Sequence, residues 1–490
     1  MLKQIEIKKG TKILSVILGT LMGGFMWRCR GESGFGSSWG LYSVGLVLML
    51  LIYFVYGQRQ KMKYELIPLG AFLLGLGVTG YATVFDQLAG VVASDLPYQG
   101  QEVYSPVNPY SGVLIFFIMG LTFTPFFSFF IGTLFSDKEY KLVHYIGAIA
   151  VFFIVSNVCK ATISQPILAF INPDQVKYAA LGLADRGFDY ASPAKAYMAH
   201  FLDRDWAQEI PYFENYYMSL EHISDLIAAV CVGIYPLIIK KDKLPLITSI
   251  VISSYTAVAT TAFGFLYAVS FDTGFLGDVV PVRALENGAG WSIWEFATGA
   301  SVGFITMLVI ALLPKKYSSK NNIDVAPLEN NKIISLIFNI IATVFIFALT
   351  PMRAVGIRIG KLLYNEGLLE DDSPTGDIIM IVLTVALGVF LVIKIVKNIM
   401  KNNTTPLGVN PVEFSRKALP AYFGMCVVLY FFTNHAPVLH LPYGEMTSLY
   451  KFAYIMTDTE NFETLLMFIT FVLITIIFIP FSRKIYPKEK

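Results

Sequence analysis

The stretch that decides the fold is LYSVGLVLMLLIYFVYGQRQKMKYELIPLGAFLLGLG, residues 41–77. It holds two apolar runs, beginning at Leu41 and Leu66, separated by a short loop that carries Arg59, Lys61 and Lys63. About 20 apolar residues are enough to cross the hydrocarbon core of a bilayer as a helix. The loop is too short to fold by itself, and its basic residues are typical of cytoplasmic loops. The stretch therefore predicts a transmembrane helical hairpin with a cytoplasmic connection.

The same alternation continues along the chain and predicts an all-α, polytopic integral membrane protein with about 12 transmembrane helices. Hydrophobic residues make up 55% of the chain and charged residues only 15%, so lipid must be the solvent for much of the surface. Residues 1–490 are expected to form a single transmembrane domain. The expected spans are 13–27, 41–56, 66–85, 112–135, 142–162, 221–239, 246–271, 292–313, 333–350, 378–396, 419–433 and 462–481.

Charge is distributed unequally between the two sets of loops. Most of the 37 Lys and Arg residues fall in alternate loops and at both termini, and most of the 35 Asp and Glu residues fall in the other loops. This asymmetry predicts a multi-pass protein of the plasma (inner) membrane with both termini cytoplasmic. The net charge of +2 gives no support to nucleic acid as a partner, so membrane lipids and an anionic substrate are the expected partners.

The longest extracytoplasmic loop covers residues 163–220 and is rich in aromatic residues. It contains Ser192 followed by Pro193, the pattern of an N-cap with proline at the first helical position. We therefore expect one short helix from Pro193 to Trp206, within a loop that is not an independent domain.

Positively charged residues gather at the expected outer ends of three spans. Guanidinium groups bind phosphate and carboxylate with paired hydrogen bonds, which predicts a substrate-binding rim around an outward-facing cavity. The alternative is that these residues pair with acidic side chains or lipid head groups and anchor helix ends. The residues are Arg28, Arg30, Lys160, Arg353 and Arg358.

Five further titratable residues are candidates for acid–base chemistry at the same depth: Asp86, His222, Asp225, Asp272 and Glu295. Asp225 shares a helix face with Glu221, four residues earlier, and neighbouring carboxylates raise each other's pKa. For Glu221 and Glu463 the favoured interpretation is a favourable position in the first turn of a helix. Histidines show no compact metal-ligand spacing, so neither a metal nor a cofactor is expected.

Asp86 and Asp272 also end two similar segments, YATVFD at 81–86 and YAVSFD at 267–272. Both are expected at the outer face, which leads to the hypothesis of parallel four-helix repeats. Cys29 and Cys159 are expected near that face as well, and free thiols are favoured over a disulfide between them.

The seventh span is unusually rich in hydroxyl groups. These hydroxyls either line a pathway or hydrogen-bond to carbonyls of their own helix, and both interpretations remain open. They belong to Ser253, Ser254, Tyr255, Thr256, Thr260 and Thr261.

Three functions fit these patterns. We expect a transporter (permease) for an anionic or sugar-like solute, because glycine-interrupted helices and the hydroxyl-rich span suit a transport path. The absence of an ionisable residue near the membrane midplane argues against a proton-coupled carrier. The alternative is a membrane-embedded transferase that acts on a lipid-linked or phosphate-bearing substrate at the outer leaflet, although the sequence carries no known catalytic signature. The third is a non-catalytic subunit of a membrane assembly.

Overall fold

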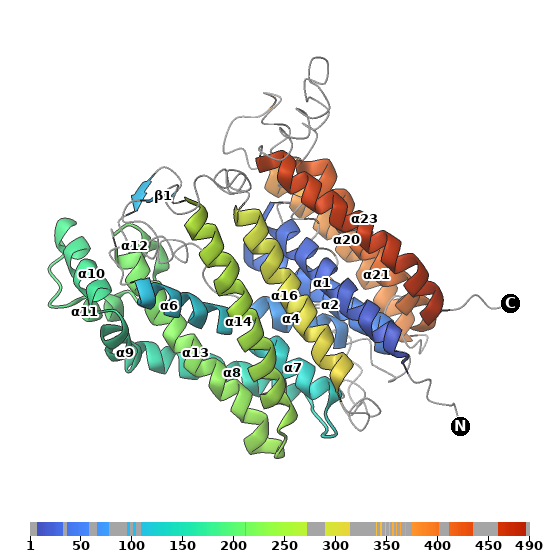
Figure 1. Cartoon of the computed structure of the whole chain (residues 1–490), viewed down its shortest axis with the longest axis horizontal. Coiled ribbons are helices and arrows are strands. Elements are labelled where there is room, and N and C mark those ends of the chain that lie inside the picture. Colours follow the sequence, from blue (N-terminus) through green and yellow to red (C-terminus); the bar gives the residue numbers. More distant parts are fainter. Residues whose placement is uncertain are drawn as a thin grey trace. The chain divides into compact units, whose positions relative to one another are not determined.

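The computed structural model describes residues 7–32, 37–57, 66–77, 96–98, 101–103, 109–210, 212–271, 290–313, 375–400, 411–434 and 459–486, with isolated positions between 340 and 368. Helices account for most of these residues (Figure 1). Strands β1 (Leu96–Tyr98) and β2 (Gln101–Val103) form a short antiparallel hairpin, which the all-α prediction did not include.

Seven helices of the described part are long and apolar enough to cross a membrane. All of them coincide with expected spans, so the chain has the character of a membrane protein. They are α1 (Lys9–Glu32), α2 (Ser37–Ile52) with the π-helix η1 (Tyr53–Gly57), α8 (Leu142–Ala161), α13 (Phe213–Lys240), α14 (Leu244–Phe271), α16 (Gly290–Leu312) and α23 (Thr459–Ile485).

Three more helices lie at expected positions: α4 (Leu66–Leu76), α20 (Thr375–Met400) and α21 (Pro411–Asn434). Most of the expected span at 333–350, the second half of the span at 66–85, and the segment 81–86 of the hypothetical repeat lie outside the described residues.

The expected continuous span at 112–135 is broken in two, so that prediction is wrong in this detail. Three residues, 122–124, separate α6 (Pro109–Leu121) from α7 (Pro125–Phe135), and the two helices are bent by 41° relative to each other. Pro125 lacks a backbone N–H and disfavours a helical conformation at Thr124, which explains the position of the break. Counted as one span, this bent pair raises the number of candidate spans among the described residues to eight.

The chain divides into two compact units. Unit 1 comprises residues 1–76, 130–144 and 295–490, and unit 2 comprises residues 77–129 and 145–294.

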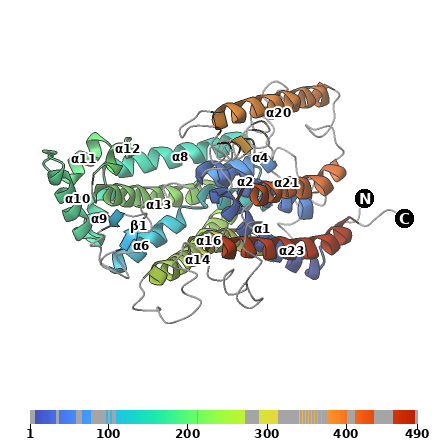
Figure 2. The ribbon, with the colours of Figure 1, turned by 90° about the horizontal axis from the view of Figure 1, so that it is seen from above.

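Within unit 1, α1 packs against α2, α21 and α23 (Figures 1 and 2). Its contact with α16 is made by glycines spaced four apart, Gly19 and Gly23 against Gly299 and Gly303. A Cβ atom added at Gly303 would lie 1.9 Å from the carbonyl oxygen of Gly19. The two backbones therefore touch, as in the small-residue interfaces of membrane helices.

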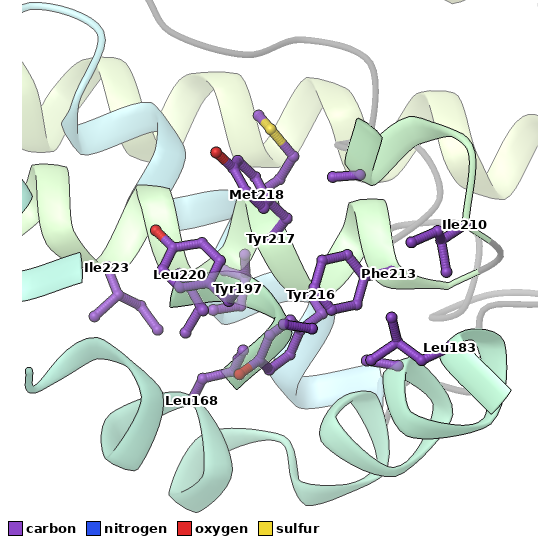
Figure 3. Packing of buried hydrophobic residues seen from close by; sticks show 14 of the residues in the cluster. Leu168, Leu183, Tyr197, Ile210, Phe213, Tyr216, Tyr217, Met218, Leu220 and Ile223 are labelled. Atoms are coloured by element: carbon purple, nitrogen blue, oxygen red, sulfur yellow. The ribbon is translucent and has the colours of Figure 1, made fainter. Parts of the chain in front are cut away.

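Within unit 2, α6 and α14 pack against α13. The N-terminal end of α13 carries a cap of four short helices (Figure 2). They are α9 (Ser164–Ile171), α10 (Pro173–Asp185), α11 (Pro193–Ala199) and α12 (Arg204–Gln208). Buried residues from these helices and from α13, among them Leu168, Leu183, Tyr197 and Tyr216, form a common core (Figure 3).

The helix expected from Pro193 does begin there, because the side chain of Ser192 accepts a hydrogen bond from the backbone N–H of Lys195. It ends at Ala199 rather than reaching Trp206. A second helix, α12, begins instead after Asp203, whose side chain accepts a hydrogen bond from the backbone N–H of Trp206. The expectation of one helix over this stretch is therefore wrong.

Candidate functional site

Among the described residues of unit 1, the most extensive ionic contacts join the ends of four helices. We call the group formed by Arg28, Arg30, Glu295, Glu463 and Tyr430 the arginine–glutamate cluster. The C-terminal parts of α1 and α21 supply the arginines and the tyrosine, and the N-terminal parts of α16 and α23 supply the glutamates.

Arg28 bridges both glutamates. Its Nη1 lies 2.6 Å from Oε2 of Glu295, and its Nη2 binds Oε2 of Glu463. Arg30 binds the other oxygen of Glu295 at 3.0 Å and lies over the ring of Trp27, 5.3 Å from its centroid. Counting the described side chains, the cluster therefore pairs two positive charges with two negative ones.

Burial makes this pairing obligatory. Arg28, Arg30 and Glu295 are no more than 3% exposed. An ionised side chain taken out of water costs several kcal/mol unless a partner compensates it, and removing one partner of a buried pair costs about 3–5 kcal/mol. The cluster can lock helix ends together, and its arginines can bind an anion only in exchange for a glutamate.

The structure thus brings together three residues that the sequence singled out: Arg28, Arg30 and Glu295. They lie in the interior of unit 1, each beside an opposite charge, and not as separate rim and acid–base groups. Sequence reasoning assigned Glu463 only a favourable position at the start of a helix, and it missed Tyr430. The available signal was a carboxylate at the start of an apolar span, which is costly in lipid without a partner.

A second group of buried polar residues lies in unit 2, between α8 and α13. Lys160 Nζ donates to Oε1 of Glu221 at 2.7 Å, and the hydroxyl of Ser156 donates to Oδ1 of Asp225 at 2.6 Å. His222 and Asp225 are buried, at 1% and 4% exposure, while Lys160 and Glu221 are half-buried. The sequence predicted that Glu221 and Asp225 share a helix face, and the structure adds Lys160, which binds Glu221.

Tyr197 of α11 lies close to this second group. Its side chain is completely buried, and its hydroxyl has no hydrogen-bond partner among the described residues. Burial, and then the negative charge of Glu221, raise the pKa of Tyr197 well above its usual range. The side chain is therefore a neutral hydroxyl at every physiological pH.

A third feature is the hydroxyl face of α14, formed by Ser249, Ser253, Thr256 and Thr260. Their spacing of four, three and four residues places them on one side of the helix, and all four are buried. Ser253 Oγ lies 3.2 Å from Oγ1 of Thr124, at the break between α6 and α7.

Most hydroxyls of this face lack a partner. In the part of the chain that the structure describes, the side-chain oxygens of Ser249, Thr256 and Thr260 form no hydrogen bond, and neither does that of Thr261. Bonding to carbonyls of the same helix is therefore the wrong interpretation for Thr256, Thr260 and Thr261. A buried hydroxyl left unpaired costs about 1–3 kcal/mol, so a ligand or water at this face would be favoured.

Four of the predicted site residues lie outside the described residues: Asp86, Asp272, Arg353 and Arg358. The four cysteines are free thiols, which agrees with the expectation for Cys29 and Cys159, and both of these are buried. No group of three or more His, Cys, Asp or Glu side chains within the described ranges is arranged to hold a metal ion.

Comparison with known proteins gave no further assignment: no protein-family model, no curated protein and no solved structure matches this chain.

Proposed function

We propose that the chain is a membrane transporter, a permease for an anionic or sugar-like solute. The single observation that carries this proposal is the hydroxyl face of α14 beside the broken helix α6–α7. Transporters commonly bind substrates where a transmembrane helix is interrupted, because the interruption frees polar backbone groups inside the membrane.

The chemistry of the face suits a hydroxyl-bearing or otherwise polar solute. Each serine or threonine hydroxyl both donates and accepts, and Thr256 and Thr260 are completely buried with unpaired oxygens. A solute that pairs with them gains hydrogen bonds that the protein alone does not make. From Ser249 to Thr260 the face extends about 16 Å along α14, roughly half the thickness of the hydrocarbon core.

The proposal includes the finer architecture expected from the sequence. The chain would cross the plasma (inner) membrane about 12 times, in parallel four-helix repeats, with both termini in the cytoplasm. The long apolar helices support a location in the membrane, and the basic loop Lys240–Lys243 between α13 and α14 supports the proposed orientation. Membrane lipids and the solute are then the partners.

The test is solute flux into liposomes that contain the purified protein, with radiolabelled glucose and succinate as the first probes. Thr256→Val and Thr260→Val remove a hydroxyl at nearly constant volume. We expect each substitution to reduce flux at least tenfold, because the solute loses a hydrogen-bond partner. The melting temperature should stay unchanged or rise, because the substitution removes a buried hydroxyl that has no partner.

Thr470→Val is the matched control, because the hydroxyl of Thr470 bonds to the carbonyl of Leu466 in its own helix. We expect normal flux from this variant. A different outcome would support the alternative, a transferase. The protein would then move none of a broad panel of anionic and sugar solutes but would turn over a lipid-linked donor.

A further inference from the structure

The carboxylate of Glu463 is held by two donors that approach different oxygens. Nη2 of Arg28 binds Oε2, and the hydroxyl of Tyr430 donates to Oε1 at 2.6 Å. Because each oxygen of the planar group receives its own donor, Arg28 and Tyr430 together match the shape of a carboxylate. Both are buried, at 3% and 0% exposure, and a dry site strengthens such contacts.

The two glutamates of the arginine–glutamate cluster are held unequally. Among the described residues, two guanidinium groups bind Glu295, one on each oxygen, whereas one guanidinium group and one neutral hydroxyl bind Glu463. The side chain of Glu463 is also more exposed, 8% against 2% for Glu295. It lies four residues, about 6 Å, from the start of α23, so Glu463 is the carboxylate that can leave the cluster more easily.

We propose that Arg28 and Tyr430 form a carboxylate-binding site, that Glu463 is its internal occupant in this conformation, and that a carboxylate group of a solute binds there in exchange for the Glu463 side chain. The exchange keeps two positive and two negative charges in the cluster. It therefore avoids the cost of leaving Arg28 buried without a counter-charge.

This inference goes beyond the proposed transport. It assigns a chemical class of ligand to a particular site, and binding at that site is measured at equilibrium without any flux. A protein that binds carboxylates at Arg28 but moves no solute would leave the inference standing and the transport proposal refuted.

The experiment removes the internal occupant and supplies a small carboxylate from outside. Glu463→Ala leaves a space beside Arg28 that acetate fits. We expect this variant of the full-length protein to have a lower melting temperature in sodium chloride. Sodium acetate at the same ionic strength should recover most of the loss, with a saturable concentration dependence.

Two controls show whether acetate acts at this site. The double variant Arg28→Met with Glu463→Ala removes one charge of each sign, and acetate should leave its melting temperature unchanged. Glu139→Ala removes an exposed carboxylate, 54% exposed, and should behave as the unaltered protein does.

The inference is overturned if acetate stabilises Glu463→Ala no more than it stabilises the double variant. Should Glu463→Ala fail to fold in chloride, extraction in acetate decides the matter. Recovery of folded protein only in acetate supports the site. Failure in both salts, with Glu463→Gln folding normally, contradicts it.

Discussion

Tyr197 and Tyr217 contact each other edge to face, 4.9 Å between ring centroids, yet their hydroxyls have different surroundings. The Tyr217 hydroxyl donates to the carbonyl of Phe201, while that of Tyr197 has no partner among the described residues. We expect Tyr217→Phe to lower the free energy of unfolding by about 1 kcal/mol through the lost hydrogen bond. Tyr197→Phe should leave it unchanged or raise it by up to about 1 kcal/mol, because a desolvated, unpaired group is removed. Chemical denaturation of the two variants in detergent measures the difference.

The pKa of Tyr197 adds a pH criterion to this comparison. Because burial raises that pKa, the hydroxyl is protonated in the folded state, and it is also protonated in the unfolded state below about pH 10. Its contribution to stability is therefore constant at neutral and mildly alkaline pH and falls only above the unfolded pKa. A difference between Tyr197→Phe and the unaltered protein that changed between neutral and mildly alkaline pH would contradict this assignment.

Individual side chains also mark the limit of prediction from sequence. Arg28 and Glu295 are recognisable because ionisable groups in apolar stretches are costly and need partners. Their pairing is not recognisable, because Arg28 lies 267 residues from Glu295 and 435 residues from Glu463. Contacts over such separations depend on how helices pack, which a local pattern does not encode.

At the scale of elements, the contact between α1 and α16 depends on glycine. A Cβ atom at Gly303 would lie 1.9 Å from the backbone of α1, so Gly303→Ala must push the helices apart. We expect a loss of about 1–3 kcal/mol in the free energy of unfolding, as for other overpacked interiors. Gly424→Ala in α21 is the control, since nothing lies within 4 Å of its added Cβ atom, and it should gain up to about 1 kcal/mol. Similar melting temperatures for the two variants would refute the close contact.

Element boundaries were predictable where the signal is local. The start of α11 at Pro193 follows from Ser192. The break between α6 and α7 was not predicted, although Pro125 is a local signal for it. The sequence did not predict that α13 begins at Phe213, because hydropathy marks only the part of a helix that suits lipid. The first turns of α13 belong to the core of the cap, where Phe213 and Tyr216 pack against other protein side chains.

For the whole molecule, the number of times that the chain crosses the membrane before a given residue decides on which side of the membrane that residue lies. Four of the long apolar helices and the bent pair α6–α7 precede Lys241 within the described residues, which makes five candidate crossings. Helix α4 is only 11 residues long, and its predicted continuation to residue 85 would make a sixth. With six crossings, Lys8 and Lys241 lie on the same side of the membrane, and with five they lie on opposite sides.

Labelling of introduced cysteines distinguishes these arrangements. In a background with the half-buried Cys231 changed to Ser, we expect Lys8→Cys and Lys241→Cys to react with a membrane-impermeant maleimide only after the cells are opened. Asp189→Cys, in the exposed connection between α10 and α11, should react with intact cells, because one crossing, α13, separates it from Lys241. Labelling of Lys241→Cys but not Lys8→Cys in intact cells would remove the third crossing and refute the count of about 12 spans. Labelling of Lys8→Cys and Lys241→Cys from outside would instead invert the topology, and the basic loops would then face away from the cytoplasm.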